Sequence, residues 1–178
     1  MPWKPIGKTF AVVREIQYMP NAIVPGSFDP ITNGHLDIIE RASHLFDQVT
    51  VAVAINSTKT PMFSLEERVE MTREVCSHLS NVTVGTFEGL LVEYAVHRGA
   101  AAIVKGLRAV SDFEYELQMA LMNRRLYPGV ETVFMMTGAE YSYLSSSIVK
   151  EISRLGGSIE GLVPEIVEKR LRRKIGQK

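Results

Sequence analysis

Five short apolar runs, each followed by a segment with helical spacing of apolar residues, constrain the fold of this chain more than any other feature. The run Gln48–Ile55 is apolar or small on both faces, as expected of a strand in the middle of a parallel sheet. Strands that alternate with helices form a parallel sheet covered on both sides. We therefore predict an α/β fold, a doubly wound and mostly parallel five-stranded sheet with helices on both faces, with strands near residues 22–24, 48–55, 82–84, 102–104 and 132–136.

The chain has 178 residues, which is the size of one domain with a proper core. Residues 1–18 differ from the rest, with Trp3, the only tryptophan, standing between Pro2 and Pro5. We expect 1–18 to be a leader, a tag or an over-called start, with an extra strand or arm as the alternative. Residues 19–178 are expected to form one domain without an internal linker.

Composition excludes several classes of protein. Lysine plus arginine equal aspartate plus glutamate at 20 each, so no general basic field favours nucleic acid. No run of about 20 apolar residues predicts a membrane span. Cys76 is the only cysteine, so it cannot form an internal disulfide, and a reducing cytoplasmic location is expected. One cysteine and four scattered histidines do not predict a structural zinc site.

The stretch Ala22–His35 predicts a strand, a tight turn and a helix start in direct succession. Pro25 and Gly26 end the apolar run, and Asn33-Gly34-His35 opens a helical pattern. Free N–H groups and the helix dipole favour an anion at such a helix start, where His35 can face the same ligand. The stretch lacks the glycine pattern of dinucleotide binders and the Gly-Lys-Ser/Thr of a P-loop.

Further polar side chains follow the predicted strands, and these can converge at the carboxyl edge of the sheet. Their cations and hydroxyls, with no evident nucleophile and base, favour phosphoryl chemistry, which depends on positioning and charge stabilisation. A Ser-His-Asp hydrolase using Ser27, His35 and Asp29 or Asp37 is the alternative, although nothing resembles a nucleophile elbow. The converging residues are Ser27, His35, Lys59, Lys105, Arg108 and Ser145–Ser147.

Several motifs carry a resemblance to a known family. Thr32-x-Gly34-His35 resembles the (H/T)xGH signature of the nucleotidyltransferase superfamily. Residues 25–35, 59–63, 106–116 and 144–150 resemble the corresponding stretches of bacterial phosphopantetheine adenylyltransferases, with Gly106–Glu116 the most specific. The resemblance extends from Ala22 to at least Glu151.

This resemblance implies a Rossmann-like fold and transfer of AMP from ATP to 4'-phosphopantetheine, giving dephospho-coenzyme A and pyrophosphate without a covalent enzyme intermediate. It further implies a cytoplasmic, Mg²⁺-dependent homohexamer in coenzyme A synthesis. Feedback inhibition by coenzyme A competing at the same pocket is a separate hypothesis. No protein ligand to the metal is expected.

The resemblance also implies roles for single residues. His35, Lys59 and Arg108 would be catalytic, with His35 on the α-phosphate, Lys59 on the phosphates of both substrates and Arg108 on those of ATP. The nucleotide would contact Ser27, Phe28, His35, Gly106, Arg108, Glu116, Ser145, Ser146 and Ser147. The acceptor would contact Ser27, Lys59, Leu90, Leu91, Lys105 and Asn123.

Three positions depart from the family pattern. Ser27 replaces a common threonine and keeps its hydroxyl, whereas Lys105 replaces a common arginine and loses the bidentate fork. Tyr141 stands where some members have tryptophan.

Two other functions stay open: a related nucleotidyltransferase acting on nicotinamide mononucleotide or an alcohol phosphate, and a catalytically silent sensor of ATP or coenzyme A.

Overall fold

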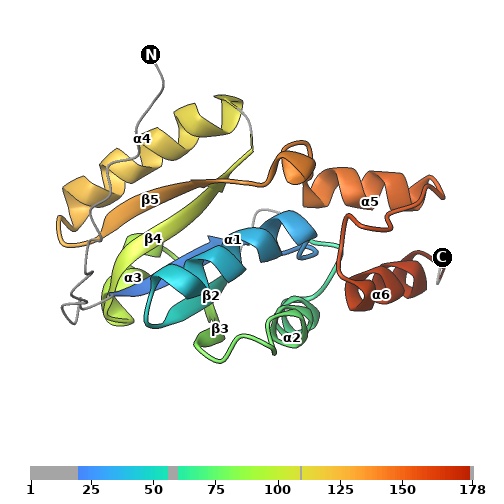
Figure 1. Cartoon of the computed structure of the whole chain (residues 1–178), viewed down its shortest axis with the longest axis horizontal. Coiled ribbons are helices and arrows are strands. Elements are labelled where there is room, and N and C mark those ends of the chain that lie inside the picture. Colours follow the sequence, from blue (N-terminus) through green and yellow to red (C-terminus); the bar gives the residue numbers. More distant parts are fainter. Residues whose placement is uncertain (1–19, 56–59, 109, 177–178) are drawn as a thin grey trace, which may run out of the picture.

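The fold is a five-stranded sheet in which every neighbouring pair of strands is parallel (Figure 1). The computed structural model describes residues 20–55, 60–108 and 110–176, so the expectation for residues 1–18 lies outside the described residues. The strands are β1 (Asn21–Gly26), β2 (Val49–Ala54), β3 (Val82–Phe87), β4 (Ala100–Leu107) and β5 (Glu131–Met136). The helices are α1 (Asn33–Leu45), α2 (Leu65–Val75), α3 (Leu91–His97), α4 (Val110–Leu126), the 3₁₀ turn η1 (Ala139–Tyr141), α5 (Ser146–Arg154) and α6 (Glu165–Gly176).

The strand order β3-β2-β1-β4-β5 places the first strand in the centre. The chain runs outward from β1 to β2 and β3, then crosses to the other side for β4 and β5. Adjacent strands at such a reversal feed loops to opposite sides and leave a crevice at their carboxyl ends. The predicted doubly wound α/β fold is confirmed, and the switch point lies between β1 and β4.

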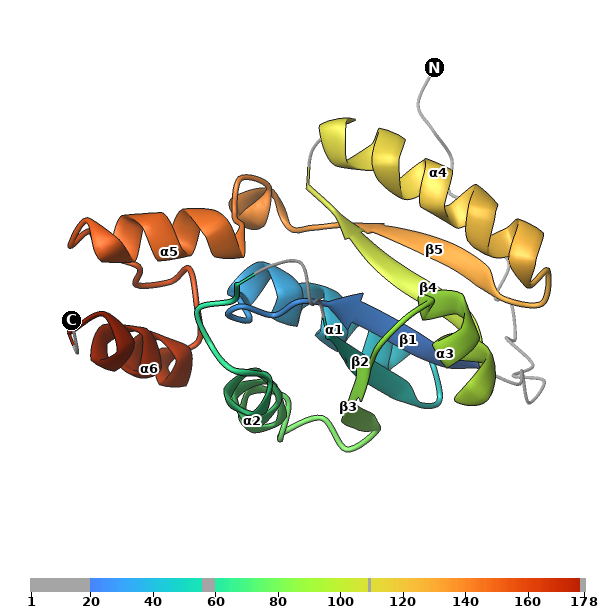
Figure 2. The same ribbon diagram turned by 180° about the vertical axis from the view of Figure 1, so that it is seen from behind.

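Alternation along β1 divides the core between the two faces of the sheet. Ala22 and Val24 pack into the cluster that includes α1, α2, α5 and α6, whereas Ile23 packs into the cluster that includes α3. Viewed from behind, α3 and α4 cover the second face (Figure 2). The two faces of the sheet are therefore both buried, as a central parallel strand requires.

Capping residues set the starts of three helices at defined positions. Thr32 caps α1 and Ser145 caps α5, each accepting a hydrogen bond from a backbone N–H three residues on. A capping box starts α2: the Ser64 hydroxyl accepts from the Glu67 N–H, and the Glu67 carboxylate accepts from the Ser64 N–H.

Strand β4 is longer than predicted. The expected strand was 102–104, but β4 continues because Lys105, Gly106 and Leu107 pair with residues of β5. Placing Lys105 after the strand was therefore wrong: it is part of the ladder, and Arg108 is the first residue beyond it. The polar and glycine residues hid this continuation, since they break the apolar run that signals a strand.

Apolar side chains also remain exposed on α4, which covers β4 and β5 with one side. Tyr115 and Leu121 are 63% and 61% exposed in the single chain. Among the described residues, no helix has the length and apolar character needed to cross a membrane.

Candidate functional site

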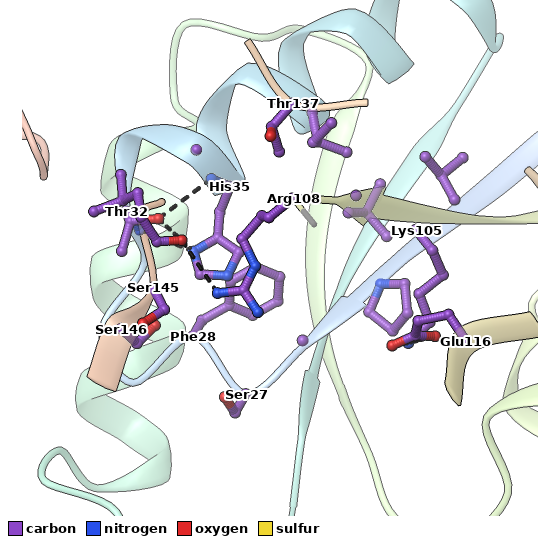
Figure 3. Close-up of a pocket in the computed structure, with 18 of the residues that line it drawn as sticks. Ser27, Phe28, Thr32, His35, Lys105, Arg108, Glu116, Thr137, Ser145 and Ser146 are labelled. Atoms are coloured by element: carbon purple, nitrogen blue, oxygen red, sulfur yellow. Dashed lines mark hydrogen bonds and ion pairs between the residues drawn. The ribbon is translucent and has the colours of Figure 1, made fainter. Parts of the chain in front are cut away.

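A cavity of about 460 Å³ opens at the switch point between β1 and β4 (Figure 3). Its wall combines the β1–α1 turn, the start of α1, the end of β4 and the start of α5. Several of its residues were predicted from sequence to bind the nucleotide, and they come from positions more than 100 residues apart. These are Ser27, Phe28, His35, Gly106, Arg108, Glu116, Ser145, Ser146 and Ser147.

Two helix N-termini face this cavity. Thr32, Gly34 and His35 line it from α1, and Ser145–Ser147 line it from α5. The Ser146 hydroxyl donates to the Pro30 carbonyl oxygen at 2.8 Å, which ties the start of α5 to the β1–α1 turn. Two sets of helix N–H groups and two dipoles therefore act on one volume, and an anion such as a polyphosphate fits it.

The orientation of His35 follows from its hydrogen bonds with Thr32. The backbone N–H of Thr32 donates to Nδ1 of His35 at 3.0 Å, and Oγ1 of Thr32 lies 2.9 Å from the same nitrogen. A backbone N–H can only donate, so Nδ1 carries no proton in this arrangement. The neutral ring must then hold its proton on Nε2, where it is a hydrogen-bond donor for a ligand in the cavity.

Burial is the main cause that lowers the pKa of His35, to about 4, and the nearby positive charge of Arg108 lowers it further. The imidazole is therefore neutral at pH 7. Phe28 lies edge-on to the ring with centroids 5.2 Å apart and is itself buried, so it supports His35 from below. His35 thus offers a fixed neutral donor rather than a cation.

The cations at the site hold different positions. Arg108 is exposed, donates to the Leu144 carbonyl oxygen at 3.1 Å, and lies beside His35 (Figure 3). Lys105 forms an ion pair with Glu116 at 3.1 Å toward the other end of the cavity. Glu116 therefore holds Lys105, and a phosphate that uses Lys105 must compete with it.

Other predicted site residues are not brought to this cavity. Leu90 caps the start of α3 and Leu91 is its first residue, while Asn123 is buried on α4; none of the three lines the cavity. Lys59 lies outside the described residues. Their assigned roles stay predictions.

The hydrolase alternative lacks its orienting carboxylate. Asp29 accepts from the backbone N–H groups of Met62 and Phe63, and Asp37 accepts from the Gly138 N–H. Nδ1 of His35 is occupied by Thr32 instead, so the described residues hold no Ser-His-Asp relay.

Sequence reasoning missed several residues of the site. Thr137 and Ile38 line the cavity, and Asp29, Lys150 and Arg68 bind the turns that form it. The hydrogen bonds between Thr32 and His35 were also missed. Their three-residue spacing could have predicted them, because it matches a capping box with histidine in place of glutamate.

Comparisons with known proteins agree with this geometry. The cytidylyltransferase-like family model matches residues 23–152. Phosphopantetheine adenylyltransferase of Desulforudis audaxviator is 58% identical over 160 residues, covering 90% of this chain and 98% of the relative. The enzyme of the same name from Alkaliphilus oremlandii is 62% identical over 151 residues, covering 85% and 96%.

A solved structure from Vibrio parahaemolyticus, described as a candidate nicotinate-nucleotide adenylyltransferase, has a TM-score of 0.66 and 20% identity. It covers 89% of this chain and 95% of its own. At that identity it supports the fold alone.

Proposed function

This chain belongs to the phosphopantetheine adenylyltransferase family of cytidylyltransferase-like proteins, and from that membership we infer that it transfers AMP from ATP to 4'-phosphopantetheine. The products are dephospho-coenzyme A and pyrophosphate, so the enzyme acts in coenzyme A biosynthesis. The observation that carries the chemistry is the meeting of two helix N-termini and a neutral His35 at one cavity.

The reaction needs no covalent enzyme intermediate. An oxygen of the 4'-phosphate attacks the α-phosphorus of ATP, and the bond from that phosphorus to the bridging oxygen breaks. Pyrophosphate leaves with the bonding electrons. Positioning and charge stabilisation supply most of the catalysis in such reactions.

Each residue at the cavity then has a role that its geometry supports. Nε2–H of His35 would donate to an α-phosphate oxygen as charge builds there, and Arg108 beside it would hold the β- and γ-phosphates. The free N–H groups at the start of α5 and the Ser147 hydroxyl would bind the same phosphates. Ser27 would lie between the two substrates.

The roles of five further residues rest on the family resemblance. Lys59 would bind phosphates of both substrates, and Leu90, Leu91 and Asn123 would contact the pantetheine arm. Lys105 would exchange Glu116 for a substrate phosphate.

Mg²⁺ is proposed to arrive with ATP. No group of three or more histidine, cysteine, aspartate or glutamate side chains forms a cation cage within the described part of the chain. We propose an ion held by ATP phosphates and water, because Mg²⁺ usually binds nucleotides with few protein ligands. When bound there, it would neutralise part of the charge on the phosphates.

The family resemblance supports a homohexamer, and the exposed apolar face of α4 supports self-association with a second copy of this chain as its occupant. Tyr115, Leu121 and Met122 are exposed on one side of this helix, and an apolar surface of this kind marks an interface. Light scattering on the purified chain tests the hexamer. Leu121→Glu is expected to lower the measured mass, and an unchanged hexamer would place the interface elsewhere.

Two further proposals concern regulation and location. Coenzyme A, which contains the product, would compete with ATP and phosphopantetheine in the same cavity. The enzyme would act in the cytoplasm, where buried Cys76 stays a thiol. Inhibition assays with coenzyme A test the first proposal, and lack of inhibition at millimolar concentration would contradict it.

A product assay tests the reaction itself. The chain is incubated with ATP and Mg²⁺, and with 4'-phosphopantetheine, nicotinamide mononucleotide or glycerol 3-phosphate in parallel. We expect dephospho-coenzyme A with matching pyrophosphate, and no adenylylated product from the other acceptors. ATP binding without turnover of any acceptor would instead favour the alternative function, a catalytically silent sensor of ATP or coenzyme A.

A further inference from the structure

The turn that follows β1 is held from three directions by side chains outside the predicted catalytic set. Arg68 on α2 donates through one terminal nitrogen to the Ser27 carbonyl oxygen at 2.7 Å and to that of Ala54 at 3.0 Å. The Ser146 hydroxyl on α5 binds the Pro30 carbonyl oxygen. The third hold is the carboxylate of Asp29.

Asp29 joins three segments through one buried carboxylate. Its Oδ1 accepts from the Phe63 N–H at 2.9 Å, and its Oδ2 accepts from the Met62 N–H at 3.0 Å. Nζ of Lys150, on α5, donates to Oδ2 at 2.6 Å. The side chains of Asp29 and Lys150 are 7% and 20% exposed, so little water competes with the pair.

This pair lies beside the reaction cavity. Asp29 and Lys150 line a second cavity of about 190 Å³, which shares Ser27, Ser146 and Ser147 with the first. The pair therefore links the turn that presents Ser27 to the helix whose N-terminus presents Ser145–Ser147.

We propose that the Asp29–Lys150 ion pair is a positioning device that fixes Ser27 relative to the N-terminus of α5. This rests on the proposed function, in which those two segments hold the reacting phosphates. In-line attack requires the acceptor oxygen and the α-phosphorus to be aligned within a fraction of an ångström, and small misplacements cost rate. Neither side chain need touch a substrate for the pair to control the rate.

The pair is charged, although its Asp29 end is deeply buried. Burial raises the pKa of Asp29, but the hydrogen bonds from Lys150, Phe63 and Met62 outweigh it and hold the pKa below its usual value. The carboxylate is therefore ionised at pH 7. Removing one partner leaves a buried charge and releases the attachment between the two segments.

The kinetic test uses Lys150→Met, which keeps the aliphatic chain and removes the charge. We expect kcat per ATP-binding site to fall about 10²-fold, with the KM of both substrates nearly unchanged, because each half of the site survives while alignment is lost. Calorimetric titration with ATP measures the fraction of chains that bind ATP, the competent sites by which kcat is divided. Lys150→Arg should restore most of the rate, since it keeps a cationic donor.

Lys169→Met is the matched control, because Lys169 also pairs with a glutamate but lies exposed on α6. A purely structural role for Lys150 predicts fewer competent sites with normal kcat per site, and that result would overturn the proposal. Asp29→Asn combined with Lys150→Met should lose little beyond the worse single variant, because the two act as one unit.

A second readout does not depend on turnover. Hydrogen exchange at the Met62 and Phe63 amides should accelerate in Asp29→Asn, which removes one of the two carboxylate acceptors, and not in Lys169→Met. Unchanged exchange would overturn the proposal. Lack of product from wild-type chain with 4'-phosphopantetheine would overturn the proposed function instead, and the exchange experiment would still test the attachment.

Discussion

The backbone N–H of Thr32 donates a 3.0 Å hydrogen bond to Nδ1 of His35, so the residue that caps α1 also sets the tautomer of the histidine three residues on. The hydrogen bonds that start α1 therefore also fix which nitrogen of His35 carries the proton. Nε2–H faces the cavity because Nδ1 is occupied. This relation makes the protonation state of His35 a testable property of the fold.

Replacing His35 with alanine should reduce kcat by about 10²–10³-fold, the usual loss for one donor to a developing oxyanion. ATP binding should change much less, because Arg108 and the α5 N-terminus are retained. Steady-state kinetics and calorimetric titration separate the two effects. Equal activity in the variant would exclude His35 as the donor.

The hydroxyl of Thr32 is expected to contribute to stability. Thr32→Val removes Oγ1, which accepts from the His35 N–H, while the backbone bond to Nδ1 persists. Loss of an N-cap side chain lowers the free energy of unfolding by about 1 kcal/mol. Urea unfolding measures this loss, and Thr32→Ser, which keeps the cap, is the control that should unfold like wild type.

His35 should also make stability depend on pH. Its pKa falls from 6.5 in the unfolded chain to about 4 in the folded one, so the unfolded state binds more protons between these values. Stability from this group is complete above pH 6.5 and is lost as the pH falls toward 4, by up to about 3 kcal/mol.

Urea unfolding of wild type and His35→Asn across pH 4–8 checks this difference, since both chains share every other titrating group. The difference in unfolding free energy between wild type and His35→Asn should change by up to about 3 kcal/mol as the pH falls from 6.5 to 4. A gap that stays constant with pH would show that the ring is not neutral when folded.

Gly26 is expected to tolerate no side chain. A Cβ at this position would lie 2.8 Å from Cζ of Phe28, the ring that supports His35. Gly26→Ala should lower the unfolding free energy by about 1–3 kcal/mol and reduce kcat by displacing that ring. Gly129→Ala, where a Cβ meets nothing within 4 Å, is the control and should be close to neutral.

The sequence predicted this site well where neighbours in the chain make it. The strand, turn and helix around His35 are local, and the polar residues after β1, β4 and β5 had to meet once the sheet was parallel. The strand order that makes β1 central was not readable from periodicity. That order depends on which strands pair, and the pairs β1–β4 and β4–β5 join distant parts of the chain. The extent of β4 was also not readable, because its pairing with β5 continues through Lys105 and Gly106 despite their lack of apolar side chains.

The Asp29–Lys150 pair was beyond such reasoning for a physical reason. Its residues lie 121 positions apart, and neither periodicity nor capping reports a contact at that separation. Glu116, which was expected to contact the nucleotide, pairs with Lys105 only 11 positions away.

The last helix is expected to be held by apolar packing rather than by its charges. Arg170 pairs with Glu70 and Glu74 of α2, but both glutamates are largely exposed, and such pairs contribute about 0–1 kcal/mol. Leu171 is fully buried. Leu171→Ala should therefore lower the unfolding free energy by about 2–5 kcal/mol, and Arg170→Met by less than about 1 kcal/mol.

Urea unfolding of the two variants, at low and at high salt, measures both effects. Only the small Arg170 effect should weaken as salt is added, because salt screens exposed charges and leaves packing intact. If Arg170→Met destabilised the chain as much as Leu171→Ala, the ion pairs rather than apolar packing would hold α6 against α2.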